Sequence, residues 1–176
     1  MHFRATKLSG TFEIQLEPQR DERGFFARTW CRREFAERGL KAEIAQSNLS
    51  SNDHRGTLRG LHYQEAPYGE AKLVQCIRGS IYDVVVDLRP GSCTYCDWIA
   101  VFLTAEKHNM LYVPEGCAHG FLTMEEQSEV FYQMSQFYNP EASRGVRWND
   151  PAFRITWPAD VRVISERDRT YPDFQR

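Results

Sequence analysis

The segment from Ile81 to Leu88 constrains the fold more than any other part of the chain, because its side chains follow the two-residue period of a β-strand. Its even-numbered side chains are apolar or aromatic and would share one face. Asp83 and Asp87 would lie on the other face. A strand with two distinct faces must belong to a sheet, so the chain contains at least one sheet with differently occupied sides.

Further strand candidates lie on both sides of this segment. Leu73–Ile77 precedes it across Arg78-Gly79-Ser80, which suggests a hairpin. Trp98–Leu103 is apolar on both faces, as expected for a strand between two layers. Leu111–Val113 and Glu129–Tyr138 complete the set.

The one predicted helix spans Arg32–Arg38, with Phe35 on its apolar face and Gly39 as its C-terminal stop. Many strands, 13% aromatic residues and little helix predict an all-β protein, either a sandwich or a barrel. A length of 176 residues favours a single domain, 1–176. We expect an N-terminal arm at about 1–20 and a proline-containing C-terminal segment, about 148–176, that wraps the barrel surface.

Composition excludes several classes of partner. The net charge is −2 and the pI about 6.2, so there is no basic surface for nucleic acid or an anionic membrane. Apolar runs are far shorter than the ~20 residues of a spanning helix, and the first ten residues lack the apolar core of a secretory signal. We therefore expect a cytoplasmic protein whose five cysteines are free thiols, including the C-x-x-C at 93–96.

Two histidines stand in sequence contexts that favour a site. Pro114-x-Gly116-x-x-His119 resembles one half of the cupin pattern, in which a glycine turn directs a histidine into a barrel of two sheets. A metal-binding cupin also needs a second histidine two residues after the first, and His62 is followed there by Gln64. The sequence therefore predicts a cupin-like barrel with neither metal nor cofactor. A metal-dependent oxygenase is disfavoured for the same reason.

The residues near His62 suggest proton transfer. Arg59 lies three positions before it, Lys72 ten positions after it, and Tyr132 shares a strand face with Val130 and Met134. If that face is the interior, a histidine base, a lysine that stabilises an enolate and a tyrosine acid could act beside a carbonyl. The residues alone leave open a simpler interpretation, in which His62 and Tyr132 are ordinary core side chains.

A family resemblance favours the catalytic interpretation. The chain resembles the nucleotide-sugar epimerases of the dTDP-4-dehydrorhamnose 3,5-epimerase family, whose cupin-like fold is a double-stranded jelly-roll barrel with a few short helices. The resemblance rests on nine strings in the family's order over about 145 residues: DERGFF at 21–26, QSNLSSN at 46–52, GTLRGLHYQ at 56–64, KLVQCIRGSIYDVVVDLR at 72–89, VPEGCAHGF at 113–121, EVFYQMSQFY at 129–138, WNDPAF at 148–153, ITWP at 155–158 and ISERD at 164–168.

The resemblance implies a role for each matched position. His62 matches the general base, Asp168 the carboxylate that orients it, Tyr132 the proton donor, and Lys72 the residue that stabilises the C4 enolate. The matched substrate-binding positions surround the nucleotide and the sugar: Arg23, Phe26, Gln46, Asn48, Arg59, His119 and Tyr138. The implied partners are a nucleotide-sugar substrate and a second copy of the chain, with the N-terminal segment lending Arg23 or Phe26 to the neighbouring site.

The departures from the family pattern concern the nucleotide rather than the proton-transfer set. Arg28 stands where the family usually has a glutamate that reaches the thymine, which leaves CDP- and GDP-linked sugars open. Arg167 replaces a lysine before Asp168, and Gly69-Glu70 precedes Ala71-Lys72 where a glutamine is frequent. The alternatives are an epimerase acting on C3 or C5 only, a ketoisomerase, and a barrel that binds a sugar nucleotide without turnover.

Overall fold

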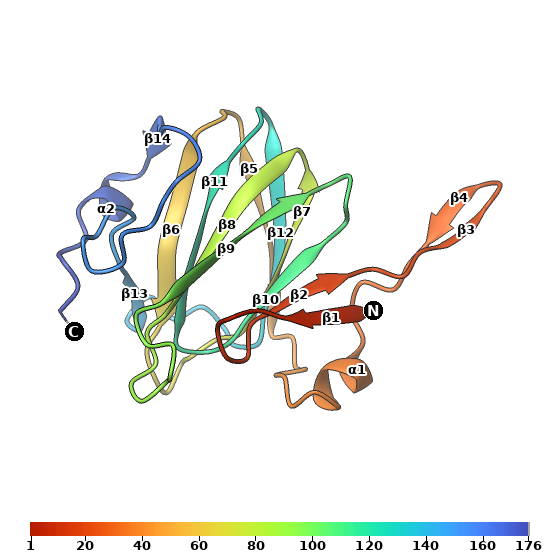
Figure 1. The fold of residues 1–176 in the computed structure, drawn as a ribbon, viewed down its shortest axis with the longest axis horizontal. Coiled ribbons are helices and arrows are strands. Elements are labelled where there is room, and N and C mark those ends of the chain that lie inside the picture. Colours follow the sequence, from red (N-terminus) through yellow and green to blue (C-terminus); the bar gives the residue numbers. More distant parts are fainter. Residues whose placement is uncertain (176) are drawn as a thin grey trace.

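Two antiparallel sheets form the body of the protein, as the computed structural model of residues 1–175 shows (Figure 1). The first sheet has the order β1 (His2–Ala5), β2 (Phe12–Gln15), β10 (Met110–Val113), β7 (Lys72–Arg78), β12 (Ser128–Met134) and β5 (Gln46–Asn52). The second has the order β13 (Ser143–Gly145), β6 (Thr57–Gln64), β11 (Cys117–Thr123), β8 (Ser80–Asp87) and β9 (Trp98–Thr104), and β14 (Val163–Ile164) runs parallel to β6. The all-β prediction is confirmed.

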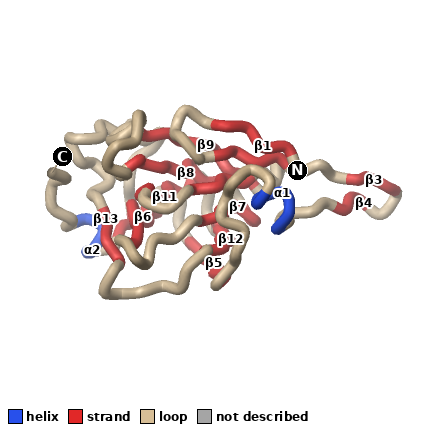
Figure 2. The backbone as a smooth tube through the Cα atoms, turned by 90° about the horizontal axis from the view of Figure 1, so that it is seen from below, coloured by secondary structure: helices blue, strands red, loops and turns tan. Residues whose placement is uncertain are grey.

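A small hairpin projects from this body. It consists of β3 (Gln19–Asp21) and β4 (Gly24–Phe26), and every residue of both strands is exposed. Figures 1 and 2 both show it extending away from the two sheets. The only helices in residues 1–175 are α1 (Arg32–Ala36), which buries Phe35 as predicted, and α2 (Glu166–Arg169). No helix in that range is long and apolar enough to cross a membrane.

The space between the sheets is an apolar core over part of its length. Its side chains come from both sheets and, for Leu8, from the turn between β1 and β2: Leu8, Val74, Cys76, Ile81, Val85, Ile99, Leu103, Leu111, Val113, Cys117, Phe121 and Val130. Burial raises the pKa of Cys76 to about 11 and that of Cys117 to about 12, so both thiols behave as small apolar side chains. All five cysteines are free, as predicted.

The outer faces of the sheets are covered by different parts of the chain. The segment after β13 packs Phe153, Trp157 and Phe174 against the outer face of the second sheet. Helix α1 packs Phe35 against Ile14, Met110 and Tyr112 on the first sheet. Both sides of each sheet are therefore occupied over much of their area, which explains why few strands show a simple apolar and polar alternation.

Two strand predictions are wrong in detail. Arg78-Gly79-Ser80 does not close a hairpin, because β7 pairs with β10 and β12 in the first sheet and β8 with β11 and β9 in the second. The turn carries the chain from one sheet to the other. Strand β9 lies between two layers, as predicted: Ile99 and Leu103 pack in the core between the sheets, and Trp98 and Ala100 pack against the cluster on the outer face. Strand β12 ends at Met134, so Tyr138 lies in the following loop.

Gly60 of β6 and Gly120 of β11 touch where these two strands pair. A Cβ added to Gly60 would lie 2.5 Å from Gly120 Cα, and Gly60 has φ +117°. The strand register shifts at this point: His119 lies opposite His62, whereas Phe121 lies opposite Arg59. Because of this shift, Arg59 and His62, three positions apart, both line the interior pocket described below.

We expect Gly60→Ala to destabilise the fold by more than about 3 kcal/mol, measured as the free energy of unfolding in denaturant. Gly24→Ala is the matched control, since Gly24 has φ +125° but nothing within 4 Å of its Cβ position. Both variants carry the conformational cost of alanine at positive φ, and only Gly60→Ala adds overlap with a neighbouring backbone. Equal losses in the two variants would show that the contact with Gly120 is unimportant.

Candidate active site

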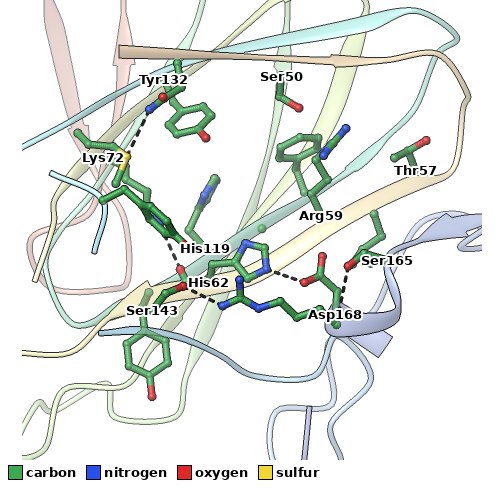
Figure 3. A pocket seen from close by; sticks show the side chains of 18 of the residues that line it. Ser50, Thr57, Arg59, His62, Lys72, His119, Tyr132, Ser143, Ser165 and Asp168 are labelled. Carbon is green, nitrogen blue, oxygen red and sulfur yellow. Dashed lines mark hydrogen bonds and ion pairs between the residues drawn. The ribbon is translucent and has the colours of Figure 1, made fainter. Parts of the chain in front are cut away.

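A cavity of about 890 Å³ opens between the two sheets, at the end that the apolar core leaves unfilled. His62 and His119 project into it from paired positions on β6 and β11. Lys72 and Tyr132 line it from β7 and β12 of the other sheet. Figure 3 shows these side chains converging on one space from both walls. The structure therefore brings together residues that are up to 70 positions apart in the chain.

His62 is held by a carboxylate from the C-terminal segment. Its Nε2 lies 2.6 Å from Asp168 Oδ1, and the Gly60 amide donates to Asp168 Oδ2 at 3.2 Å. Burial acts to raise the pKa of Asp168, but the hydrogen bond and charge of His62, with the Gly60 amide and Ser165, outweigh it and hold that pKa below its ordinary value. An ionised Asp168 can only accept, so Nε2 carries the proton and Nδ1 is left as a base.

A second histidine–carboxylate pair lies beside the first. His119 Nε2 is 2.9 Å from both oxygens of Asp83, which is completely buried. Burial raises the pKa of Asp83, against the opposing effects of His119 and Lys72. Asp83 was not among the site residues that the sequence suggested. The signal was present in the alternation of β8, which places Asp83 on the same face as the core residues Ile81 and Val85.

Lys72 forms a buried ion pair at the same end of the cavity. Its Nζ lies 2.9 Å from Glu70 Oε1 and donates to the His62 carbonyl oxygen at 3.2 Å. The side chains of Lys72 and Glu70 are 9% and 3% exposed. An ammonium so placed can donate its remaining N–H to an oxygen atom in the cavity.

Tyr132 approaches from the opposite wall. It shares an inward face with Val130 and Met134, as predicted, and in Figure 3 its hydroxyl points into the space that His62 also borders. The hydroxyl has no hydrogen-bond partner within residues 1–175. Burial raises the pKa of Tyr132, so the phenol keeps its proton at neutral pH. A free phenol facing a free imidazole nitrogen is suited to give a proton where the histidine takes one.

Polar and aromatic side chains form the mouth of the cavity. Gln46 accepts a hydrogen bond from the Tyr138 amide at 2.8 Å, and Asn48 accepts from Gln46 at 3.3 Å. Arg59 is fixed by Asn52 Oδ1 at 2.7 Å. Hydrogen bonds from Ser143 and Arg167 lower the pKa of Tyr138.

The cavity therefore collects ten of the thirteen site residues that the sequence suggested: His62, Tyr132, Asp168, Lys72, Gln46, Asn48, Arg59, His119, Tyr138 and Arg167. The other three lie on or beside the projecting hairpin, outside the cavity of their own chain. Arg23 pairs with Asp21, Phe26 is 74% exposed, and Arg28 pairs with Glu34 at 3.2 Å. None of these three can act in this cavity unless the hairpin belongs to a neighbouring copy.

Gln64 has a structural role at the position where a metal-binding cupin would carry a histidine. Its amide donates to the carbonyl oxygens of Tyr68 and Phe137 and accepts from the Asn139 amide. Within residues 1–175 no three His, Cys, Asp or Glu side chains come together as a metal site would require. The side chains that meet in the cavity are instead a base, an acid and an ammonium, the groups needed to move a proton beside a carbonyl.

Comparison with known proteins agrees with the proton-transfer chemistry that the cavity geometry suggests. The family model described as dTDP-4-dehydrorhamnose 3,5-epimerase matches residues 5–176. The chain belongs to this epimerase family. A dTDP-4-dehydrorhamnose 3,5-epimerase of Methanothermobacter thermautotrophicus is 44% identical over 96% of this chain and 92% of its own length. A dTDP-4-dehydrorhamnose 3-epimerase of Streptomyces niveus is 38% identical over 96% and 82%.

Solved epimerase structures have the same fold. The crystal structure of dTDP-4-dehydrorhamnose 3,5-epimerase from Elizabethkingia anophelis superposes with a TM-score of 0.96 at 36% identity, over 99% of this chain and 96% of that one. The prediction of a cupin-like barrel is thereby confirmed, and the chain is an enzyme of the isomerase class.

The depressed pKa of Asp168 gives a prediction about acid stability. The stabilisation that ionised Asp168 gives the folded state is complete above the pKa of an unfolded aspartate, about 3.9. It is lost as the pH falls through the lower pKa that Asp168 has in the folded state. We expect Asp168→Asn to be less stable than the parent protein at pH 7, with the difference in unfolding free energy shrinking below about pH 4. Asp160→Asn, at an exposed position, is the control. A difference that stays constant down to pH 2 would contradict the assignment.

Proposed function

We propose that this protein inverts C3 and C5 of a dTDP-linked 4-keto-6-deoxy-hexose, converting dTDP-4-dehydro-6-deoxy-D-glucose to dTDP-4-dehydro-L-rhamnose. One observation carries the proposal: a base, His62, and an acid, Tyr132, line opposite walls of one cavity. Inversion of a carbon needs a proton to leave from one face and return to the other. Family membership supports the substrate class.

The C4 ketone makes the hydrogens on both neighbouring carbons acidic, so the same groups can serve each carbon in turn. His62 Nδ1 removes the proton, and Asp168 stabilises the imidazolium that forms. The Lys72 ammonium donates to the C4 oxygen as it becomes an enolate. Tyr132 then delivers its proton to the opposite face of the same carbon. A flip of the sugar ring presents the second carbon to the pair.

The mouth of the cavity suits the nucleotide. Arg59 presents a guanidinium that can bind a diphosphate through two N–H groups, and Arg167 lies near the same opening. The Tyr138 ring is 52% exposed and can stack on a base. Gln46, Asn48 and His119 are within the same lining and can bind sugar hydroxyls. Because Arg28 stands where the family usually has a glutamate, CDP and GDP sugars are the competitors to test beside dTDP.

We further propose that the active unit is a homodimer in which each hairpin completes the cavity of its neighbour. The hairpin leaves its own body and exposes Phe25 and Phe26 to solvent. An isolated two-stranded hairpin with exposed aromatic side chains gains stability only by packing against another surface. Arg23, at its turn, would then add a cation to a site on the second copy. Such an enzyme would act in the cytoplasm, where nucleotide sugars are made.

The reaction is tested by NMR in heavy water with dTDP-4-keto-6-deoxyglucose and its CDP and GDP analogues. We expect deuterium at both C3 and C5, fastest with dTDP. Deuterium at C3 alone would identify a 3-epimerase like the Streptomyces niveus relative. Saturable binding without exchange would identify a binding barrel, and exchange with none of the sugars would contradict the proposal.

Variants at the base and the acid separate proton removal from proton delivery. We expect His62→Ala to abolish exchange at both carbons, with a fall of at least about 10²-fold, because no base remains. In Tyr132→Phe, C3 exchange should persist longer than C5 inversion, because only delivery from the opposite face is lost. Inversion at C5 at the parental rate in either variant would contradict these roles.

The dimer is tested by complementation between two inactive chains. Arg23→Ala removes a hairpin contribution and His62→Ala removes the base. If hairpins are exchanged, co-expressed chains form mixed dimers with one complete cavity, and activity should recover in that fraction. If each hairpin serves its own chain, every cavity of the mixed dimer lacks one group and activity stays at the level of the separate variants.

A further inference from the structure

Glu70 is a buried carboxylate that none of the proposed chemical steps uses. It lies just before β7, and its side chain lines the cavity while being only 3% exposed. Its Oε1 is 2.9 Å from Lys72 Nζ. Its Oε2 is buried and has no hydrogen-bond partner within residues 1–175. A buried carboxylate with one oxygen unpaired is costly to the fold, so its position calls for a functional explanation.

The contacts of Lys72 show what this carboxylate does to the ammonium. Of three N–H groups, one is directed to Glu70 Oε1 and one to the His62 carbonyl oxygen. Two fixed acceptors leave a single N–H on a side chain that lines the cavity. Glu70 is also the only carboxylate within ion-pair distance of Lys72 in residues 1–175. A buried ammonium without such a partner would be strongly disfavoured.

The charge of Glu70 also reaches the proton donor. After burial, Arg59 and Glu70 are the charged groups that act on Tyr132: Arg59 lowers the pKa of the phenol and Glu70 raises it. Several titratable or charged groups surround Lys72. They come from the loop before β7 and from β6, β8, β11 and β12, and they are Glu70, His62, Arg59, Asp83, His119 and Tyr132. Among these, Glu70 is the one acidic group that is paired with Lys72 and not with a histidine.

We propose that Glu70 is a positioning residue of this epimerase: it aims the Lys72 ammonium at the C4 oxygen and balances its charge, so that one N–H remains for the developing enolate. The inference rests on the proposed function. It adds a residue that acts through Lys72 and Tyr132 without touching the reacting carbons.

Glu70→Gln tests the proposal, because it keeps the size of the side chain, removes its charge and introduces the glutamine that is frequent in the family beside this lysine. We expect kcat for C5 exchange to fall by about tenfold to hundredfold with KM changed less than about threefold, since the loss concerns the enolate and not binding. The basic limb of the pH–rate profile should move to lower pH, because Tyr132 loses the charge that favours its protonated form. Glu70→Asp should restore the basic limb, while its shorter side chain leaves kcat low.

Glu65→Gln is the matched control. Glu65 lies in the same segment between β6 and β7, is half exposed, and pairs with Arg144 away from Lys72. It should leave kcat, KM and the pH profile at their parental values. Parental kinetics in Glu70→Gln would overturn the proposal. So would a fall in kcat with an unmoved pH profile and a lower melting temperature, which indicates a merely structural role.

A readout independent of turnover separates this inference from the proposed function. Tyrosine labelled with ¹³C at Cζ is titrated by NMR, with the Tyr132 signal assigned by its absence in Tyr132→Phe. The midpoint for Tyr132 should lie at lower pH in Glu70→Gln than in the parent and in Glu65→Gln. If the parent shows no exchange with any sugar but the midpoint moves, the proposed reaction fails and the charge coupling stands. An unmoved midpoint overturns the role of Glu70 in either case.

Discussion

The backbone of β6 around Gly60 positions the groups on one wall of this cavity. The register shifts where Gly60 touches Gly120 of β11, and both Arg59 and His62 line the cavity beside this point. The Gly60 amide binds Asp168, and β14 pairs with β6 just before α2 delivers that carboxylate. The His62 carbonyl oxygen on the same strand accepts from Lys72. One strand thus positions His62, its carboxylate Asp168, the Arg59 guanidinium and the Lys72 ammonium through its backbone, which is more rigid than side-chain packing alone.

The two-sheet architecture supplies what a single strand cannot, namely a second wall. His62 belongs to one sheet and Tyr132 to the other, so the distance between base and acid is set by the packing of the sheets. Both sheets are braced from outside, one by α1 and one by the C-terminal segment. In the proposed reaction, a substrate between them would meet a proton acceptor on one face and a donor on the other. Inversion of a carbon requires a base and an acid on opposite faces, whereas simple hydrogen exchange does not.

Local patterns in the sequence were sufficient to predict individual strands and the helix, but not which strands pair with one another. The alternation in 81–88 and the helix around Phe35 depend on neighbours in the chain and were predicted correctly. The turn at Gly79 looks the same whether the next strand returns to the same sheet or crosses to the other, so the hairpin was wrong. Asp83 was missed because an aspartate on a strand is usually exposed, and only the partner His119 makes its burial tolerable. The contact of Asp168 with His62 was available only through the family resemblance.

The charges in the cavity are placed to stabilise the transition state of the proposed reaction more than the bound substrate. His62, His119 and Lys72 each have their own carboxylate, and with His62 neutral and Asp168 ionised that pair carries one negative charge before proton transfer. The unpaired positive charge lies at the mouth with Arg59 and Arg167, where a diphosphate would bind. In the proposed reaction, His62 would gain a positive charge beside the enolate at the moment the enolate forms. Stabilisation would then be greatest in the transition state and small in the ground state, which is the condition for raising kcat instead of only tightening binding.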